Sequence, residues 1–386
     1  MKLNVTVIGG GMIVADQILP SLYQLQRHGK VGNIVICARR QSTLDALPKG
    51  FTPTTAPYKD VLANAAERNL AIIALPDEIH FDATMTAIEA QQHVICVKPL
   101  VQTVQHGQMI ERAARDRNLF VGVEYHKRFD DRALMARERY RRGLFGEFKL
   151  GTARLFEPWY YRHSNFQNWF TLNAADSFTY IGCHYVDLVH FITGLLPTSI
   201  SVCGIPEKFP NGNEGWLWND ARVRWENGAI LNVQNALGYP DLGPGSNTQG
   251  MTLWTSKGDA GGFLDHNDSY RGLSYCYVEG DKRSPDKRYS EPSPDYMQIV
   301  PDSTGGTRVV GYGYRSLEAL IDAAAQIELG QTTLDHIDST GILATPKNSY
   351  FNELVTEGAR LSLANDGREV LLQYGVLPFV HLKSYL

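Results

Sequence analysis

The sequence contains few cysteines, no strong excess of charge of either sign and no long apolar run. Its five cysteines are odd in number and show no CxxC spacing, which argues against a disulfide framework and a structural zinc site. A formal net charge of −4 over 386 residues provides no basic field for nucleic acid. No apolar run approaches the roughly 20 residues that span a membrane. Met1-Lys2 leads directly into an apolar strand and leaves no room for a secretory leader. We therefore expect a cytoplasmic protein that has no metal and no nucleic-acid or membrane partner.

The composition is that of a globular chain long enough for two domains. Of its residues 43% are apolar, and no internal repeat or low-complexity segment interrupts them. Cys37, Cys96 and Cys203 lie among strand-forming residues, so we expect them to fill space in the core. The charged run Arg137–Arg142 is typical of the solvated face of a helix and is too short for a nucleic-acid patch.

The first third of the chain alternates short apolar strands with helical stretches. The expected strands are Val5–Ile8, Ile34–Cys37, Ala71–Ala74, His93–Val97 and Leu119–Val123. The later helical stretches are Tyr58–Ala66, Asp77–Ala90 and Thr103–Arg117. Continuous apolar strands joined by helices predict a parallel sheet covered on both faces. The fold class is therefore α/β, beginning with a doubly wound parallel sheet of the Rossmann type over residues 1–125.

The pattern changes from about Glu147 onward. Trp216–Trp225 and Ala229–Gln234 alternate apolar with polar residues and are joined by Glu226-Asn227-Gly228, which predicts an antiparallel hairpin. Residues 126–386 are expected to form a C-terminal α+β domain with an open, mostly antiparallel sheet. The stretch Asp281–Gly306, rich in Pro, Ser, Asp and Gly, is predicted to be a long excursion from that sheet.

A glycine-rich turn follows the first strand and opens a helical stretch. Gly9 and Gly11 occupy the first two glycine positions of the G-x-G-x-x-G pattern, whereas Val14, with Ala15 beside it, occupies the third. Such a turn lets the backbone approach a pyrophosphate, whose charge is met by the helix N-terminus. The turn therefore predicts a dinucleotide site rather than a plain loop. The residues expected there are Gly9, Gly11, Met12 and Ile13.

The residues after the second strand indicate which dinucleotide is preferred. An NAD enzyme commonly presents an acidic side chain to the ribose hydroxyls at this point, but this chain has Ala38-Arg39-Arg40-Gln41-Ser42. A guanidinium group binds a phosphate in bidentate fashion. We expect Ala38, Arg39, Arg40 and Ser42 to favour NADP, with NAD remaining possible. The alternative is that both arginines are solvated turn residues.

Lys98 follows the strand His93–Val97, and Pro99 prevents that strand from continuing normally. This sequence places a cation at the edge of the sheet where α/β folds build their sites. A lysine there can hold a substrate oxygen and favour its alkoxide-like state.

Phe178 to Thr193 is predicted to be a helix that ends at Gly194. Tyr180, His184 and Asp187 are spaced to share one face of it. A histidine titrates near neutrality and can accept the proton of a substrate hydroxyl, while Asp187 orients the imidazole. The alternative is a buried, hydrogen-bonded pair without chemistry. His190 is expected to be a core histidine, because its spacing from His184 does not suit a zinc site.

Two further groups are candidates for substrate contact. His126 and Arg128 follow the fifth strand at the domain junction, where a structural role is an equal alternative. The segment that contains Tyr161, Arg162 and Trp169 is aromatic and polar, as expected of a loop that stacks on a sugar and binds its hydroxyls. The alternative for this loop is core packing.

These motifs together resemble the Gfo/Idh/MocA family of glucose-fructose oxidoreductases, inositol dehydrogenases and rhizopine-catabolism proteins, over nearly the whole chain. The matching elements are Gly9-Gly10-Gly11, Leu75-Pro76 with His80, His93–Leu100, Gly122–Phe129 and Gly182–Asp187. The resemblance implies a Rossmann domain and a C-terminal domain whose open sheet often joins subunits into a homo-oligomer. It also implies NAD(P)-dependent chemistry on sugars or cyclitols, with Leu75, Pro76 and His80 near the cofactor.

Two positions depart from the family pattern. Val97 stands where the family usually has a glutamate before the lysine, and Tyr180 stands where it often has an aspartate four residues before the histidine. A phenol with an ordinary pKa of about 10 cannot supply a carboxylate's charge at neutral pH. Lys98 and His184 are retained without these carboxylates.

The function expected from the sequence is hydride transfer between a nicotinamide and a hydroxyl or carbonyl carbon of a sugar, cyclitol or sugar derivative. His184, Lys98 and Tyr180 are the expected catalytic residues. One alternative is a glycoside hydrolase or lyase that oxidises its substrate transiently and returns the hydride. The other is a sensor that binds the dinucleotide without turnover.

Overall fold

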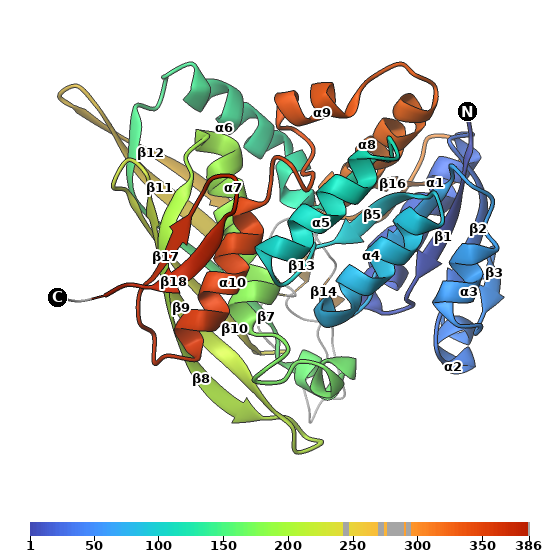
Figure 1. Cartoon of the computed structure of the whole chain (residues 1–386), viewed down its shortest axis with the longest axis horizontal. Helices are drawn as coiled ribbons and strands as arrows, with labels where there is room; N and C mark the ends of the chain where they lie inside the picture. The colour runs from blue at the N-terminus through green and yellow to red at the C-terminus, as the bar shows by residue number, and fades with distance from the viewer. Residues whose placement is uncertain (242–246, 269–273, 276–288, 291–294, 385–386) are drawn as a thin grey trace. The chain divides into compact units, whose positions relative to one another are not determined.

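A computed structural model describes residues 1–241, 247–268, 274–275, 289–290 and 295–384 of the chain. It divides into two compact units, whose elements are labelled in Figure 1. Unit 1 comprises Met1–Phe129 and Ile299–Glu353, and unit 2 comprises Asp130–Gln298 and Leu354–Leu386. The sequence boundary expected after residue 125 thus lies four residues before the first boundary of the structure, and a later segment returns to unit 1.

Unit 1 is built on a six-stranded sheet of order β3-β2-β1-β4-β5-β6 in which all neighbours are parallel. Its strands are β1 (Leu3–Ile8), β2 (Val31–Cys37), β3 (Thr52–Thr54), β4 (Leu70–Ile73), β5 (His93–Val97) and β6 (Val121–Glu124). After β3 the chain crosses back to place β4 beside β1, which is the doubly wound topology predicted from the apolar strands. The predicted α/β class is confirmed.

Helices connect these strands. They are η1 (Val14–Ile18), α1 (Leu19–Arg27), α2 (Gln41–Asp45), α3 (Tyr58–Ala63), η2 (Asp77–Ile79), α4 (His80–Glu89), α5 (Val104–Arg115) and η3 (His126–Phe129). The first of them is π-helical and begins at Val14, the position of the missing third glycine. Val14 is fully buried, so the wider helical turn coincides with a side chain where a glycine would allow closer packing.

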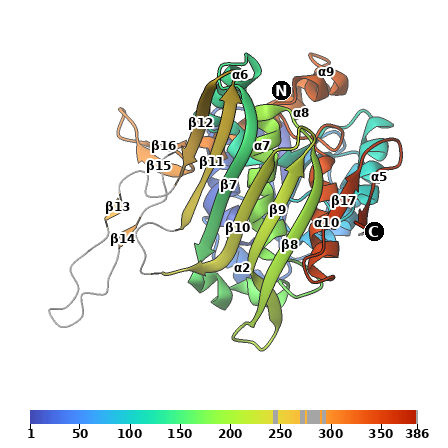
Figure 2. The same cartoon turned by 90° about the vertical axis from the view of Figure 1, so that its left-hand side faces the viewer.

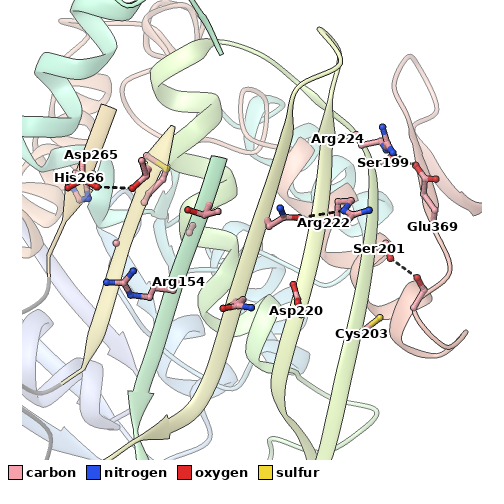
Figure 3. Close-up of a pocket in the computed structure, with 18 of the residues that line it drawn as sticks. Arg154, Ser199, Ser201, Cys203, Asp220, Arg222, Arg224, Asp265, His266 and Glu369 are labelled. Carbon is pink, nitrogen blue, oxygen red and sulfur yellow. Dashed lines mark hydrogen bonds and ion pairs between the residues drawn. The ribbon is translucent and has the colours of Figure 1, made fainter. Parts of the chain in front are cut away.

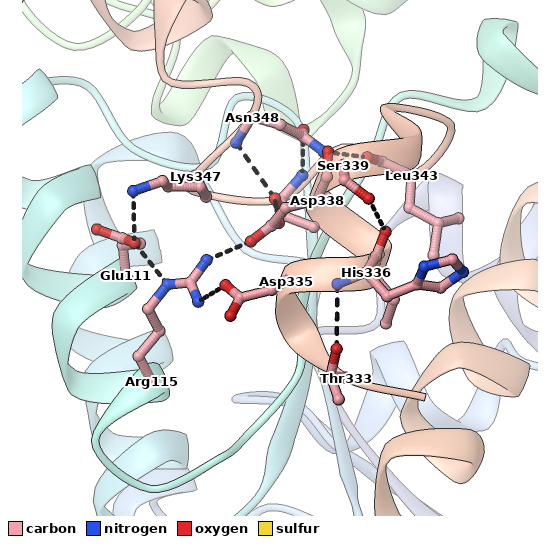
Figure 4. Close-up of polar contacts among 12 residues, drawn as sticks. Glu111, Arg115, Thr333, Asp335, His336, Asp338, Ser339, Leu343, Lys347 and Asn348 are labelled. Atoms are coloured by element: carbon pink, nitrogen blue, oxygen red, sulfur yellow. Dashed lines mark hydrogen bonds and ion pairs between the residues drawn. The ribbon is translucent and has the colours of Figure 1, made fainter. Parts of the chain in front are cut away.

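The segment that returns to unit 1 contains the strand pair β15 (Gln298–Pro301) and β16 (Thr307–Val310), then α8 (Tyr312–Glu328) and α9 (Leu334–Thr340). Helix α8 packs against α1 and β6. Figure 4 shows how α9 is tied to α5: Arg115 donates to Glu111 and to Asp335, each at 2.7 Å, and also to Asp338. The pairs with Asp335 and Asp338 join residues 220 and 223 positions apart, whereas Glu111 lies one turn away on α5 itself.

Unit 2 is built on an eight-stranded sheet of order β12-β11-β7-β10-β9-β8-β17-β18, antiparallel except between β7 and β10. Its strands are β7 (Glu147–Pro158), β8 (Pro197–Lys208), β9 (Glu214–Trp225), β10 (Ile230–Tyr239), β11 (Thr248–Lys257), β12 (Ala260–Asn267), β17 (Val370–Gln373) and β18 (Phe379–Leu382). A separate backbone pair joins β13 (Ser274–Tyr275) to β14 (Tyr289–Ser290). The expected β9–β10 hairpin and the mostly antiparallel sheet are confirmed.

The helices of unit 2 lie on one face of this sheet, and its other face is open (Figure 2). They are α6 (Asp131–Arg141), η4 (Trp159–His163), η5 (Asn165–Asn168), η6 (Phe178–Gly182), α7 (Cys183–Thr193) and α10 (Phe351–Leu363), the last of which begins in unit 1. Strand β9 alternates exposed with buried residues, as expected of a sheet with one solvated face.

Two expectations concern single segments. Cys37 and Cys96 are buried as expected. Cys203 is exposed, because it lies on the open face of β8, and its predicted place in the core was wrong. Residues 281–288 and 291–294 of the excursion expected at Asp281–Gly306 lie outside the described residues. Among the residues that are described, no helix has the length and apolarity needed to span a membrane.

Candidate functional site

The turn between β1 and the first helix has the geometry of a phosphate-binding loop. Gly9 has a φ of +120°, and a Cβ there would lie 2.0 Å from the carbonyl oxygen of Ala74. A Cβ on Gly11 would meet no described atom within 4 Å, so the backbone is open to a ligand there. The N–H groups of Val14 and Ala15 donate to the Gly11 carbonyl at 3.0 and 3.2 Å, so the helix begins at the loop. The loop therefore fits a pyrophosphate, which would meet the positive end of the helix.

The residues predicted to bind the cofactor gather at one edge of the parallel sheet. They are Gly9, Gly11, Met12 and Ile13 after β1, Ala38, Arg39, Arg40 and Ser42 after β2, Leu75, Pro76 and His80 after β4, and Lys98 after β5. Strands β1 and β4 are neighbours at the point where the winding reverses. Open α/β sheets bind their ligands at the carboxyl edge beside this point.

His80 connects the loops that follow β4 and β5. Its ring is fully buried, with Nδ1 2.8 Å from the carbonyl oxygen of Pro99 and Nε2 2.8 Å from that of Leu75. Burial would lower the pKa of His80, but Cys96, Asp77 and the Pro99 carbonyl outweigh it and raise that pKa to about 10. A protonated imidazole donates to both carbonyls. His80 thus fixes the loop that contains Lys98, which is half-buried and joined to Pro99 by a cis peptide bond.

The loop after β2 presents two exposed guanidinium groups. Arg39 and Arg40 follow the buried Ala38, and Arg40 has extended backbone angles immediately before α2. The loop contains no acidic residue before Asp45.

Three polar side chains, those of Gln17, Glu124 and His126, meet at the end of β6. Of these, only His126 was predicted from the sequence to have a role. His126 Nδ1 lies 3.0 Å from one carboxylate oxygen of Glu124, and Gln17 donates to the other at 2.9 Å. Gln17 and Glu124 are 107 positions apart, so sequence spacing gave no signal for this contact. Arg128, two residues beyond His126, is buried with its guanidinium 5.9 Å from the centre of the Tyr125 ring.

In unit 2 the predicted helix is present as η6 followed by α7, and it ends at Gly194 with a φ of +81°. His184 and Asp187 are both buried on α7. Gly182 allows the helix to approach β10, because a Cβ there would lie 2.3 Å from Asn235 Oδ1. His190 Nδ1 lies 2.8 Å from the carbonyl oxygen of Leu195, a structural contact at the helix end, and this histidine is half-buried rather than fully buried.

The aromatic loop brings three of the predicted residues together around Phe166. The Tyr161 ring stacks on Phe166 with centroids 5.2 Å apart, and the Tyr180 ring meets Phe166 edge-on at 4.9 Å. Trp169 lies 5.9 Å from Tyr180, again edge-on. Burial and the neighbouring Glu157 raise the pKa of Tyr161 well above its ordinary value, so its phenol stays neutral.

Arg162 has structural partners within unit 2. Its side chain is buried, Nε donates to the Leu237 carbonyl at 2.5 Å, and Nη1 pairs with Glu207. The guanidinium also lies 3.7 Å from the centre of the Trp159 ring. A role for Arg162 in substrate binding stays a prediction, whereas these contacts anchor the aromatic loop to the sheet.

The open face of the unit 2 sheet contains a hollow of about 1070 Å³ (Figure 3). Its lining contains side chains of both charges: the basic Arg154, Arg222 and Arg224, and the acidic Asp220, Asp265 and Glu369. Several of these side chains are paired within the face, as in the Ser199–Glu369 hydrogen bond of 2.6 Å. The hollow spans exposed strands, whereas the predicted site residues lie on helices, loops and the edge of the other sheet.

Comparison with known proteins finds a family model that matches the N-terminal part of the chain. Residues 3–125 match the model described as "Oxidoreductase family, NAD-binding Rossmann fold", GFO_IDH_MocA. The D-glucoside 3-dehydrogenase of Escherichia coli is 27% identical over 199 residues, which are 50% of this chain and 54% of that protein. The levoglucosan dehydrogenase of Pseudarthrobacter phenanthrenivorans is 23% identical over 202 residues, 50% of this chain and 52% of that protein. The matched region therefore spans about half the length of these relatives.

Solved structures agree over a longer stretch of the chain. GenD2 from gentamicin A biosynthesis, solved in complex with NAD, has a TM-score of 0.72 at 17% identity, and the match covers 97% of both chains. At this identity the similarity shows the fold of the chain.

Proposed function

Because residues 3–125 belong to the Gfo/Idh/MocA oxidoreductase family, with its NAD-binding Rossmann fold, we propose that this protein is an NAD(P)-dependent oxidoreductase of a sugar, a cyclitol or a derivative of one. This proposal is supported most directly by two features at the carboxyl edge of the parallel sheet: the open backbone at Gly11, after β1, and the Lys98 cation, after β5. The names of the two curated relatives, both sugar dehydrogenases, support the substrate class.

Each polar residue has a role in this proposal. When bound, the nicotinamide supplies the hydride acceptor or donor. Lys98 holds the substrate oxygen and stabilises negative charge that develops on it. His184 takes or returns the hydroxyl proton, and Asp187 orients its imidazole. Tyr180 relays a proton without supplying the charge of a carboxylate.

We propose NADP as the preferred cofactor. Arg39 and Arg40 are exposed directly after β2, and a charge-assisted contact to a 2′-phosphate is worth about 1.5–3 kcal/mol, or roughly ten- to a hundredfold in affinity. Titrating NADP and NAD against the intrinsic fluorescence of the protein tests this. Equal or tighter binding of NAD would contradict it.

Replacing the two catalytic side chains tests the mechanism. Lys98→Ala and His184→Ala should each lower turnover about a hundred- to ten-thousandfold, the range for a positioned proton-transfer group. Their affinity for the dinucleotide should remain largely intact, and Tyr180→Phe should have a smaller effect. Near-normal turnover in His184→Ala would show that the proton leaves by another route.

We also propose that the open face of the unit 2 sheet joins copies of the chain. Trp254 and Phe263 are exposed there as a cross-strand pair 5.5 Å apart, and Leu150, the register partner of Trp254, is exposed beside them. An exposed apolar row of this kind is typical of an interaction surface. Trp254→Ser should shift the sedimentation coefficient toward that of a monomer. A wild-type protein that already sediments as a monomer would contradict the proposal.

A further inference from the structure

The hollow on the open face of unit 2 is centred on β10. Its lining comes from β12, β11 and β7 on one side of that strand, and from β9, β8 and residues next to β17 on the other (Figure 3). In its middle β10 presents the exposed side chain of Gln234. The register partners of Gln234 are Arg154 on β7 and Asp220 on β9, both of them exposed. A base and an acid therefore flank Gln234 at one level of the sheet.

Asp220 differs from the other acids of this lining. Glu369 accepts a hydrogen bond from Ser199 at 2.6 Å, and Asp265 accepts one from Thr252 at 2.8 Å. Within the described ranges the carboxylate of Asp220 has no hydrogen bond and no ion pair. Its own copy of the chain thus leaves this acid to the solvent.

Two arginines of the lining are held only weakly. Arg154 Nε lies 3.4 Å from Thr248 Oγ1, and Arg222 Nε lies 3.5 Å from Asn232 Oδ1, which are long contacts for hydrogen bonds. Neither guanidinium has a carboxylate within 4.0 Å among the residues that the structure describes. A second copy on this face would remove water from these charges, and a charge buried without a partner is costly. The second copy must therefore supply partners for them.

A two-fold axis that runs along β10, midway between two facing sheets, supplies such partners. It exchanges the two sides of the face, so β7 of one copy lies over β9 of the other at the same level of the strands. Arg154 then faces Asp220 of the partner subunit, and the contact occurs twice, as in any two-fold interface. The two Gln234 side chains meet on the axis, where each amide offers the other a donor and an acceptor.

These contacts tolerate the usual angle between packed sheets. Facing sheets lie about 10 Å apart, and their strands cross at about 30°. Strands β7 and β9 are each one strand spacing, about 4.8 Å, from the axis, so this angle displaces them by only about 2.4 Å. A long arginine opposite a short aspartate suits the gap between the sheets.

The next level of the sheet fits the same symmetry. Ala236 of β10 has Phe156 on β7 and Trp218 on β9 as its register partners. The axis along β10 places Phe156 over Trp218 of the partner subunit, with the small Ala236 side chains between the two aromatic pairs. Apolar side chains therefore meet apolar ones beside the ionic contacts.

We infer that two copies of the chain pair about a two-fold axis along β10, with reciprocal ion pairs between Arg154 and Asp220. This inference rests on the proposed association through the open face and adds the orientation of the two copies and the residues that specify it. An axis across the strands would instead lay each strand over its own copy and bring Asp220 to Arg222 of the partner subunit.

Charge reversal in the full chain, followed by sedimentation velocity, tests the pairing. Arg154→Asp and Asp220→Arg should each raise the dissociation constant at least about a hundredfold, because like charges then face each other twice. An equimolar mixture of the two variants should associate nearly as tightly as the wild type, because each acid again faces a base. Association in the mixture also shows that both variants are folded. The double variant should associate with itself for the same reason.

Arg222→Asp is the matched control, with the same change of charge at an exposed position of β9. In the inferred arrangement Arg222 lies over Thr152 of the partner subunit, because both are register partners of Asn232, and this variant should remain associated. Dissociation of Arg222→Asp would overturn the inference in favour of the axis across the strands.

Two further outcomes would overturn the inference alone: self-association of either single reversal at the affinity of the wild type, or a mixture of the two that stays monomeric. A wild-type chain that sediments as a monomer would overturn the proposed association itself. Hydride transfer is assayed separately, so none of these results decides whether the chain is an oxidoreductase.

Discussion

Substitution by alanine should affect different properties at the two glycines of the β1 loop: the stability of unit 1 at Gly9 and the affinity for the cofactor at Gly11. Gly9 has a φ of +120°, and its added Cβ would lie 2.0 Å from a backbone oxygen of Ala74. Placing an L side chain at such an angle costs about 1–2 kcal/mol, and the overpacking adds about 1–3 kcal/mol. Gly9→Ala should therefore destabilise unit 1 by about 2–5 kcal/mol, because backbone on both sides leaves little room for relaxation.

Gly11→Ala should leave the fold intact and weaken cofactor binding. An added Cβ there meets no described atom within 4 Å, so the change in unfolding free energy should stay within about 1 kcal/mol. The same Cβ would stand where a pyrophosphate approaches the backbone, so the affinity for NADP should fall at least about tenfold, or about 1.4 kcal/mol. Gly261→Ala, on an exposed strand of unit 2 and equally without a described neighbour within 4 Å, is the control and should change neither quantity.

Differential scanning fluorimetry and calorimetric titration measure the two effects separately. Each kcal/mol corresponds to about 2–4 °C in Tm for units of this size, so Gly9→Ala should lower Tm by about 4–20 °C. Gly11→Ala should keep Tm near that of the wild type in the absence of ligand, and NADP at a given concentration should stabilise it about 1.4 kcal/mol less than the wild type. Full NADP affinity in Gly11→Ala would refute the placement of the dinucleotide on this loop.

Three further substitutions follow from the geometry. The pKa of His80 is raised from 6.5 to about 10 in the folded chain, so the stability that its protonated form contributes is complete below about pH 6.5 and is lost as the pH rises through about 10. The Tm of the wild type should therefore fall between these two pH values, and His80→Gln should show a smaller fall. Replacing Arg39 and Arg40 together by serine should weaken NADP binding about ten- to a hundredfold with little effect on NAD, and equal losses for both dinucleotides would indicate a general electrostatic effect. Arg162→Ala should raise KM for the sugar while dinucleotide affinity stays unchanged, but because its guanidinium also joins Glu207 and Leu237, a normal KM with a lower Tm would assign Arg162 to packing alone.

Local signals were sufficient for most of the elements in both units. The helix that ends at Gly194 was predicted to the residue, because a left-handed cap requires glycine and the preceding run is apolar. The short edge strand β3 was not predicted, since it has three residues, one of which is Pro53. Cys203 was misplaced because a small apolar residue in a strand gives no indication of which face it occupies.

The parts that local patterns missed depend on contacts between distant residues. The segment Ile299–Glu353 returns to unit 1, where Arg115 pairs with Asp335, a contact across 220 positions that no periodicity encodes. No role was predicted for Glu124 from the sequence, because it is a single acidic residue at the end of an apolar strand. Only the fold shows that it meets both Gln17 and His126.

The central claim is that this chain transfers a hydride between a sugar carbon and a nicotinamide. The measurement that tests it most directly is a single-turnover reaction with NADP and a panel of sugars and cyclitols deuterated at their carbinol carbons, followed by mass spectrometry of the cofactor. The account predicts deuterium in the reduced cofactor, an oxidised sugar as product, and the loss of both in Lys98→Ala. Tight binding of NADP with no deuterium in the cofactor for any member of the panel, or a cleaved product with the cofactor returned to its oxidised form, would contradict it.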